Sequence, residues 1–437
     1  MNTPAASPIS RAEIEAAQLD RLRTLIAALR TSNPFYRPIL EDTGLDDSVA
    51  DLAAFSSRCP FTTKQQITED QRANPPYGTN LTEPLENYTR FHQTSGTTAE
   101  PIRWLDTPGS WQGMVDSWKV IFEAAGVGKS DRVMFTFSFG PFLGFWMAFE
   151  AATQLGCLTM PGGALSTTAR LKMILDNNAT AICCTPTYAM RLAEVALSEG
   201  ISLESASVRA IIVAGEPGGS IPAVRQRIEA AWPNATVYDH HGMTETGPVT
   251  YQQPGIPGLI RVIEDAYLAE IIDPSTLKPA EKDQPGELVL TTLTRTASPL
   301  LRYRTGDLVL PKRVHDDGSP GGAHLAFEGG ILSRADDMLT IRGVNVYPAA
   351  VDQIIRSVPT IAEYRAFVDT DSAMPDLRIE IEPLADHEGD ASVAGELQQR
   401  FRDKLNLRIP VQTVPPETLP RFEMKARRWI KSSSTPR

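Results

Sequence analysis

The sequence predicts an α/β protein with three parts: a region of parallel α/β sheets, an antiparallel β subdomain and a small α+β unit at the C-terminal end. Two changes of pattern along the chain predict this. Strand-like and helix-like segments alternate between residues 112 and 214, which is typical of a parallel sheet with crossover helices. After residue 256 the strand-like segments become short and are separated by turns, which favours antiparallel pairing.

The individual elements follow from local patterns. Apolar residues at helical spacing predict an amphipathic helix over 11–31, and Asn33-Pro34-Phe35-Tyr36 predicts a break after it. The alternating region predicts helices over 112–125, 142–155, 166–177 and 188–199, and strands over 132–139, 181–185 and 210–214. The antiparallel part is predicted from strands over 261–264, 267–273 and 286–293 and from a hairpin tip over 316–322. The last unit has helices predicted over 349–357 and 394–405 and a strand over 377–382.

Composition bounds the class of protein. The chain has 437 residues, 42% of them hydrophobic, so it is long enough for about two or three domains with sizeable cores. Its formal net charge of −11 disfavours nonspecific binding to nucleic acid, which needs a basic surface. We find no apolar stretch long enough for a membrane span and no secretory signal. We therefore expect a cytoplasmic protein with neither nucleic-acid nor membrane partners.

The cysteines and histidines of the sequence do not favour a metal site. Cys59, Cys157, Cys183 and Cys184 form no CxxC pair, and the last three lie in apolar runs, so we expect buried, reduced thiols. The adjacent His240 and His241 also admit a zinc site. Neighbouring side chains point in different directions and no further ligands stand at suitable spacing, so zinc ranks below a nucleotide site.

Four polar clusters carry the chemistry. Thr94-Ser95-Gly96-Thr97-Thr98 combines hydroxyls with a glycine whose exposed backbone N–H groups suit a phosphate, although an ordinary polar turn has the same composition. His241-Gly242-Met243-Thr244-Glu245 ends in a carboxylate of the kind that binds magnesium together with substrate phosphates. Tyr303-Arg304-Thr305-Gly306-Asp307 ends in a carboxylate that can accept hydrogen bonds from both ribose hydroxyls. Arg334-Ala335-Asp336-Asp337 is the fourth cluster.

In this order the clusters resemble those of the adenylate-forming superfamily, whose members activate a carboxylate with ATP. The resemblance covers nearly the whole chain and implies a nucleotide site and a magnesium ion bound by Glu245. The residues that it assigns to ATP and AMP are Ser95, Gly96, Thr97, Thr98, Gly215, Glu216, Pro217, Asp239, His240, His241, Thr244, Asp307 and Arg334.

The same resemblance implies a mobile C-terminal domain. It divides the chain into an N-terminal domain over 1–335 and a C-terminal domain over 336–437, with Asp336 as the hinge between two half-reactions. Gly343 would line the tunnel for the thiol of coenzyme A. Leu419-Pro420-Arg421-Phe422-Glu423-Met424-Lys425-Ala426 resembles the motif of the catalytic lysine, which assigns that role to Lys425 beside Glu245, with Lys431 as the weaker competitor.

Three positions depart from the family pattern. Ala99 and the residues after it stand where members have a glycine and often a lysine, which puts a lysine contact to the β- and γ-phosphates in doubt. His241 replaces an aromatic residue, often tyrosine, that stacks on adenine. Met424 replaces the glycine before the lysine.

Three stretches resemble the phenylacetate–CoA ligase branch of the superfamily. They are Cys59-Pro60-Phe61-Thr62-Thr63-Lys64, the segment 185–194 and Gly215-Glu216-Pro217. The cluster of Phe137, Phe139, Phe142, Phe145 and Trp146 could form a flat apolar slot for an aromatic ring, although most of these side chains are expected to pack in the core. By resemblance, the acid pocket has Phe139 on one side and Ala214, Gly215 and Gly242 on the other.

We therefore expect an ATP-dependent, AMP-forming aryl-carboxylate–CoA ligase that uses ATP, Mg²⁺ and coenzyme A. No cationic residue marks a second carboxylate, so a small aromatic monoacid is expected; phenylacetate, benzoate and anthranilate all stay open. A homodimer is also consistent with the resemblance. Two alternatives remain at this point: an adenylating enzyme that loads a carrier protein, and a catalytically silent nucleotide-binding homologue.

Overall fold

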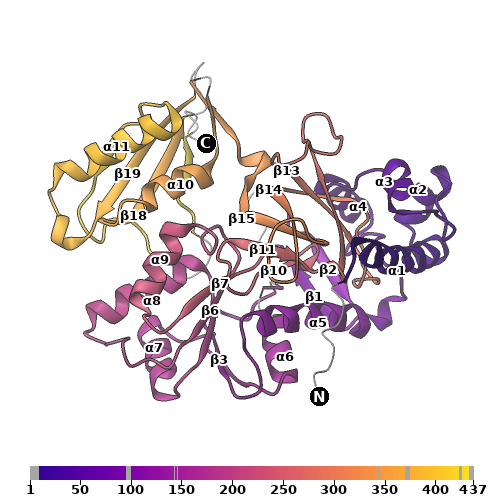
Figure 1. The fold of residues 1–437 in the computed structure, drawn as a ribbon, viewed down its shortest axis with the longest axis horizontal. Coiled ribbons are helices and arrows are strands. Elements are labelled where there is room, and N and C mark those ends of the chain that lie inside the picture. Colours follow the sequence, from indigo (N-terminus) through magenta and orange to yellow (C-terminus); the bar gives the residue numbers. More distant parts are fainter. Residues whose placement is uncertain are drawn as a thin grey trace.

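The computed structural model describes residues 9–94, 100–141, 143–144, 146–342, 344–369, 375–422 and 426–432. Three bodies of secondary structure make up the molecule (Figure 1): a parallel sheet flanked by helices, an antiparallel sheet covered by the N-terminal helices, and a smaller α+β domain above the parallel sheet and to the left of the antiparallel one. This arrangement confirms the predicted fold class.

The parallel sheet has five strands in the order β4-β3-β5-β6-β7. Its strands are β3 (Arg132–Phe135), β4 (Leu158–Pro161), β5 (Ala181–Cys184), β6 (Ala210–Val213) and β7 (Thr236–Asp239). The helices that pack against it are α5 (Pro108–Ala124), α6 (Trp146–Gln154), α7 (Thr167–Asp176), α8 (Pro186–Ser198) and α9 (Pro222–Ala231). Every residue of β5 and β6 is buried, as expected for parallel strands covered on both faces.

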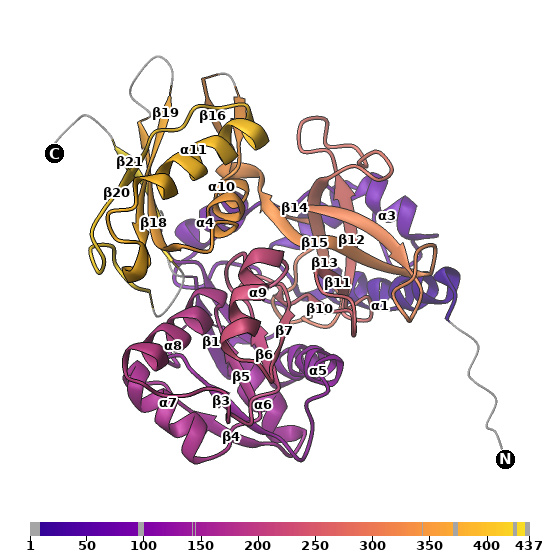
Figure 2. The same ribbon diagram turned by 60° about the vertical axis from the view of Figure 1, so that its left-hand side comes forward.

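The sheet separates two hydrophobic cores. Val133, Phe135 and Cys183 face the core that contains Trp111, Trp118 and Phe122 of α5. Met134, Ile182 and Cys184 face the core formed with α7, α8 and α9. This alternation follows from the twofold repeat of side chains along a strand. Figure 2 shows α7, α8 and α9 on the side of the sheet away from α5. Cys157, Cys183 and Cys184 are buried free thiols, as predicted, and so is Cys59.

Strand β3 is shorter than the 132–139 that the sequence predicted. It ends at Phe135 because both neighbours end there: Phe135 pairs with Pro161 of β4 and with Cys183 of β5. Residues 136–141 leave the sheet as a loop that carries Phe137 and Phe139. The helix expected over 142–155 begins later, at Trp146, within the part of the chain that the structure describes.

The antiparallel sheet has six strands in the order β10-β11-β15-β14-β13-β12. They are β10 (Thr250–Gln252), β11 (Leu259–Val262), β12 (Tyr267–Ile272), β13 (Gly286–Thr292), β14 (Tyr303–Val314) and β15 (His324–Arg334). The predicted hairpin tip over 316–322 connects β14 to β15. The pairing register between β13 and β14 shifts between Glu287 and Val289, so residues 305–307 bulge from the ladder.

The N-terminal helices cover this sheet. They are α1 (Arg11–Ser32), α2 (Tyr36–Asp42), α3 (Leu52–Arg58) and α4 (Lys64–Ala73), of which the sequence predicted the first. Leu22, Leu25 and Leu29 of α1 share a core with Leu268 and Leu293. The strands β1 (Arg90–Gln93) and β2 (Arg103–Asp106) form a hairpin beside them.

The C-terminal domain has its own core around Ile354, Ile379 and Phe401. Its strand order is β20-β19-β18-β21. The elements are β16 (Leu339–Ile341), β17 (Val344–Val346), α10 (Pro348–Arg356), β18 (Ile361–Asp369), β19 (Asp376–Pro383), α11 (Ala391–Leu405), β20 (Val411–Thr413) and β21 (Trp429–Ser432). A 3₁₀ turn, Ala335–Asp337, connects β15 to this domain.

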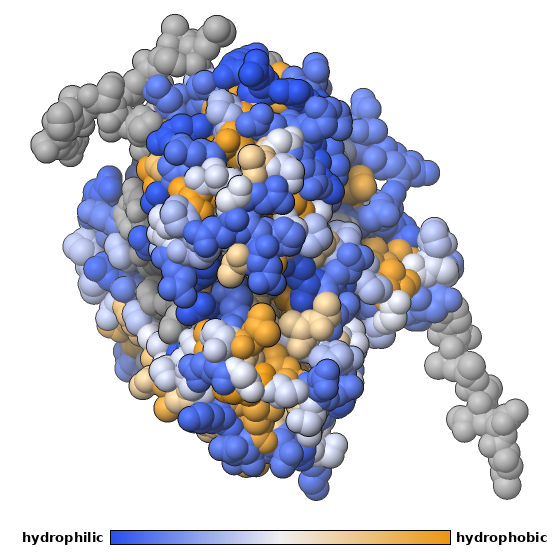
Figure 3. All heavy atoms as spheres, turned by 90° about the vertical axis from the view of Figure 1, so that its left-hand side faces the viewer, coloured by the Kyte–Doolittle hydropathy of each residue, from blue (hydrophilic) through white to orange (hydrophobic). Residues whose placement is uncertain are grey.

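Figure 3 shows one face of the molecule. The upper half of this view is mainly hydrophilic, and hydrophobic residues gather in the lower half of the view.

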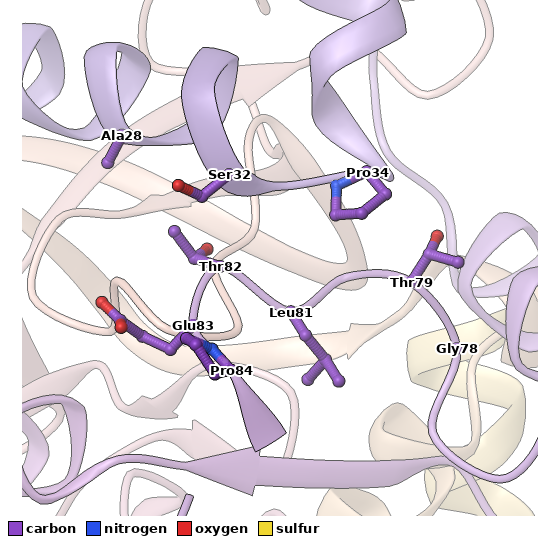
Figure 4. A pocket seen from close by; sticks show the side chains of 9 residues that line it. All are labelled: Ala28, Ser32, Pro34, Gly78, Thr79, Leu81, Thr82, Glu83 and Pro84. Carbon is purple, nitrogen blue, oxygen red and sulfur yellow. The ribbon is translucent and has the colours of Figure 1, made fainter. Parts of the chain in front are cut away.

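A crevice of about 580 Å³ lies between α1 and the segment 78–84 (Figure 4), lined by Ser32, Pro34, Thr82 and Glu83 among others. None of these residues belongs to the predicted site. Within the described ranges, every helix is too short or too polar to cross a membrane.

Candidate active site

The carboxyl ends of β3, β6 and β7 lie at one edge of the parallel sheet, where open α/β sheets bind ligands. The loop after β3 carries Phe139, the turn after β6 carries Ala214, Gly215, Glu216 and Pro217, and the turn after β7 carries residues 240–246. The structure therefore brings to one edge three groups of predicted residues that are far apart in the sequence.

Several predicted residues lie outside the described ranges: Ser95, Gly96, Thr97 and Thr98 of the phosphate loop, Phe142 and Phe145, Gly343 and Lys425. The flanks of the phosphate loop are described. The Thr94 N–H donates to the Ile102 carbonyl at 3.0 Å, and the Ile102 N–H donates to Thr94 Oγ1 at 3.0 Å. The Gln93 N–H donates to the Pro141 carbonyl at 2.7 Å, which ties the start of this loop to the loop after β3.

Asp239 ends β7 and faces the α9 side of the sheet. Ser220 Oγ donates a hydrogen bond to Asp239 Oδ2 at 2.5 Å. A Cβ on Gly219 would lie 2.6 Å from Asp239 Cγ, so only glycine fits the turn that approaches this carboxylate. Desolvation raises the pKa of Asp239 to about 6, against the opposing effects of the Ser220 hydroxyl and the Arg225 charge.

His241 and Asp307 meet although 66 positions separate them. His241 Nε2 lies 3.2 Å from Asp307 Oδ2, and neither atom has hydrogen-bonding geometry with a partner among the described residues. Arg334 Nη1 donates to Asp307 Oδ1 at 3.2 Å, and Nε and Nη2 of the same guanidinium donate to Asp336 Oδ1 at 2.8 Å and Oδ2 at 3.1 Å. The predicted adenine, ribose, phosphate and hinge residues thus form one continuous polar chain.

Gly242-Met243 and Gly247-Pro248 pair as the small strands β8 and β9, so Thr244 and Glu245 form the turn between them. A buried arginine fixes this turn. Arg295 Nη1 donates to the carbonyls of Thr244 at 2.7 Å and Glu245 at 2.9 Å. The remaining guanidinium nitrogens donate to both carboxylate oxygens of Asp106, at 2.7 and 2.6 Å.

The Arg295–Asp106 pair is almost completely buried, with side-chain exposures of 1% and 0%. The Arg295 guanidinium lies over the ring of Trp104, with its Cζ 5.1 Å from the ring centroid. Neither Arg295 nor Asp106 was predicted as a site residue, because neither stands in a motif and 189 positions separate them.

Lys64 is a third residue that the sequence prediction missed as part of the site. Its Nζ lies 3.4 Å from Glu245 Oε1, and it begins α4 directly after the N-cap Thr63. The Cys59–Lys64 motif was the only sequence signal for it. Ala99 and its neighbours lack the family lysine, and among the described residues Lys64 places a cation beside the predicted magnesium ligand.

The loop after β3 forms an aromatic cluster. Phe139 lies 5.4 Å from Phe137, 4.6 Å from Trp146 and 5.4 Å from Phe149, measured between ring centroids. Phe137 and Phe139 are partly buried and pack against the core on the α5 side of the sheet. Gly215 lies across the same edge after β6, in a left-handed conformation with φ of +93°.

Glu216 joins the two domains. Its Oε1 accepts the Thr187 N–H at 2.8 Å, and its Oε2 accepts the Ala426 N–H at 3.0 Å. Thr187 lies at the start of α8, and Ala426 directly follows Lys425. Arg227 of α9 also donates to the Ile361 carbonyl at 2.9 Å, so the C-terminal domain is seated on α8 and α9.

The family models agree with this geometry. A model described as AMP-binding enzyme matches residues 39–294, and one described as AMP-binding enzyme C-terminal domain matches residues 343–432. The chain belongs to the AMP-binding enzyme family. Phenylacetate-coenzyme A ligase of Aromatoleum evansii is 32% identical over 97% of this chain and 96% of its own length. The Thermus thermophilus phenylacetate-coenzyme A ligase is 29% identical over 97% of both chains.

These relatives identify the chain as an AMP-forming acid–CoA ligase of the phenylacetate–CoA ligase-like branch, and such ligases use ATP and coenzyme A. The solved structure of 2-hydroxyisobutyryl-CoA ligase in its postadenylation state has a TM-score of 0.90, with 29% identity over 99% of this chain and 94% of that one. The same protein in its thioesterification state has a TM-score of 0.69. The domains of this ligase are therefore oriented as in the postadenylation structure.

We predict that Arg295→Met destabilises the N-terminal domain of the ligase by about 3–5 kcal/mol, because it leaves the Asp106 carboxylate buried without a partner. Urea denaturation followed by tryptophan fluorescence measures the change. Arg21→Met is the matched control, since Arg21 forms an exposed pair with Asp265 at 3.5 Å and its loss should change stability little. Equal stabilities of the two variants would contradict the role given to Arg295.

Proposed function

We propose that this ligase activates a small aromatic monoacid as its acyl-adenylate and transfers the acyl group to coenzyme A. The observation that carries the proposal is the aromatic cluster around Phe139 at the same sheet edge as the nucleotide residues. An aromatic ring binds well against such a surface. The names of the phenylacetate–CoA ligases that it resembles support the same class of acid and coenzyme A as the acceptor.

The nucleotide would lie across the turns after β6 and β7. In this proposal Gly215, Glu216, Pro217, Asp239 and His241 surround the adenine, while the ring of His240, which the sequence assigned to the same group, faces Trp118 on the α5 side. Asp307 binds the ribose hydroxyls, and Arg334 lies near the α-phosphate or the ribose. Thr244 and residues 95–98 hold the phosphates. The 3.2 Å approach of His241 to Asp307 supports a common position for base and ribose.

Magnesium fits Glu245. This ion binds one or two carboxylates and keeps substrate phosphates among its ligands. Glu245 is the carboxylate of its turn, and the described residues contain no group of three side chains that could hold a metal without the substrate. Magnesium bound there would neutralise phosphate charge, and Lys64 Nζ would add a positive charge 3.4 Å from the same carboxylate.

The first half-reaction needs no general base, because the acid is already ionised at neutral pH. A carboxylate oxygen attacks the α-phosphorus of ATP in line, the bond to the β-phosphate oxygen breaks, and pyrophosphate leaves. The protein contributes position and charge. Lys425 is proposed to neutralise the α-phosphate. The hydrogen bond from the Ala426 N–H to Glu216 holds the residue that follows Lys425 in the chain.

In the second half-reaction the thiolate of coenzyme A attacks the acyl carbonyl carbon, and AMP leaves with the electrons of the broken anhydride bond. A free thiol has a pKa of about 8.5, so some thiolate is present without strong activation. Access would require the C-terminal domain (336–437) to turn about Asp336 and bring Gly343 to the thiol tunnel. The Arg334–Asp336 ion pair would hold the hinge before this rotation. A cytoplasmic location and a homodimer stay predictions.

The test of this function is an incubation with ATP, Mg²⁺ and a panel of acids, with and without coenzyme A, in which AMP and thioester are measured. Phenylacetate, benzoate and anthranilate should give AMP and, with coenzyme A, an equivalent of thioester. The panel includes 2-hydroxyisobutyrate, because the ligase for that acid shares the fold at 29% identity. Turnover of that acid alone would contradict the aromatic class, and transfer only to a carrier protein would contradict coenzyme A.

We predict that Lys425→Ala slows acyl-adenylate formation by roughly 10²-fold or more, the effect of losing one charge contact to the transition state. Thioester formation from supplied acyl-adenylate should be spared. Lys431→Ala serves as the control because Lys431 is the other lysine near this end of the chain. If adenylation fell in Lys431→Ala and not in Lys425→Ala, the catalytic lysine would be Lys431.

We predict that Glu216→Ala slows adenylation by roughly tenfold or more at saturating ATP, because a hydrogen bond to a charged group holds the segment after Lys425. Thioester formation from supplied acyl-adenylate should fall less, since the domain must leave this position for that step. Glu216→Gln keeps an acceptor and should lose less activity. Glu204→Ala removes an exposed glutamate of the same domain and is the control. Equal loss of both half-reactions in Glu216→Ala would point to a structural role.

A further inference from the structure

His240 is a buried imidazole whose polar atoms are not satisfied by the described residues. It is 6% exposed, and among those residues neither Nδ1 nor Nε2 has a hydrogen-bond partner. Burial and the neighbouring His241 lower its pKa to about 3, so the ring is neutral near pH 7. Buried polar side chains in native proteins almost always have partners, so a group from outside the described chain is expected to complete this one.

His240 directly follows β7, and the alternation of side chains along this strand decides which side of the sheet its ring faces. Val237 belongs to the core on the α7–α9 side, and Tyr238 packs against the core on the α5 side. Asp239 turns again toward α9, where Ser220 binds it. His240 therefore returns to the α5 side, where its ring meets Trp118 edge-on with centroids 4.4 Å apart.

Phe137 and Phe139 lie on this same side. Both pack against the core that contains Trp118. Strands β3 and β7 are three positions apart in the sheet, which corresponds to about 14 Å between their ends. Phe139 lies four residues beyond the end of β3, and an acid whose ring lies between Phe139 and the end of β7 presents a substituent toward His240, while the nucleotide occupies the Asp239 side.

We propose that His240 recognises a hydroxyl or amino group on the ring of the acid, which rests on the proposed activation of aromatic acids. A neutral imidazole offers one donor and one acceptor, and a phenolic hydroxyl or an aromatic amine can pair with either nitrogen. A second carboxylate would bring a charge next to Trp118 without a cation, so the substituent is a neutral one. Trp118 fixes the orientation of the imidazole and so makes it selective.

The ratio of kcat/KM between a substituted and an unsubstituted acid should be large, because the unsubstituted acid leaves a buried nitrogen of His240 unpaired. One hydrogen bond of this kind changes kcat/KM by roughly ten- to hundredfold. An unsubstituted acid would still occupy the aromatic slot, so the preference is graded and is measurable as a ratio.

The experiment compares kcat/KM for matched acid pairs: benzoate with its hydroxy- and aminobenzoates, and phenylacetate with its hydroxyphenylacetates. The wild-type enzyme should prefer at least one substituted acid by tenfold or more. His240→Leu should reduce this ratio to near one, and His240→Gln, which keeps a donor and an acceptor, should retain part of it. His315→Leu removes an exposed histidine and should leave the ratio as in the wild type.

The outcomes separate this inference from the proposed function. AMP formation from plain and substituted acids with equal efficiency in the wild type would overturn the role of His240 alone. The same holds for a preference that persists in His240→Leu, or for a change in the KM for ATP without a change in the ratio. If no aromatic acid gave AMP with the wild-type enzyme, the proposed function would fail and the inference with it.

Discussion

The buried ion pair between Arg295 and Asp106 is the interaction on which the geometry of the active site depends. It joins the end of β2, the segment after β13 and the Thr244–Glu245 turn, three regions that lie far apart in the sequence. Each of the three guanidinium nitrogens donates at least one hydrogen bond, which offsets the cost of burying the charges. Because Glu245 is held through its backbone carbonyl, its carboxylate is free to face Lys64 at 3.4 Å.

A second constraint acts across the domains. The Glu216 carboxylate binds Thr187 of the N-terminal domain and Ala426 of the C-terminal domain at once, so Ala426 is held beside the turn that follows β6. The TM-scores of 0.90 and 0.69 against two states of one related ligase indicate that this contact belongs to the postadenylation orientation. In the proposed cycle this contact must break before the thiol can enter. The Glu216 carboxylate would then link two things: the approach of Lys425 to the α-phosphate and the orientation of the C-terminal domain.

Local patterns predicted the helix over 11–31, the alternating strands and helices, and the clusters at strand ends, because these depend on periodicity and on turn chemistry. The tip of the β14–β15 hairpin was predicted but its two long strands were not, since glycines, Pro311 and shifts of register interrupt their alternation. Strand β3 was predicted too long because its end is set by where β4 and β5 stop. Lys64, Arg295 and Asp106 could not be assigned, because their partners lie far away in sequence. The roles of residues 95–98, Gly343 and Lys425 stay predictions.

The most direct test of the account is a crystal structure with a non-hydrolysable acyl-adenylate analogue that carries a hydroxylated aromatic acyl group. We expect the ribose hydroxyls within hydrogen-bonding distance of Asp307, the acyl ring against Phe139 on the α5 side, and the ring hydroxyl at His240. A nucleotide bound at this edge with the acyl ring on the Asp239 side, or an analogue bound away from the carboxyl ends of β6 and β7, would contradict it.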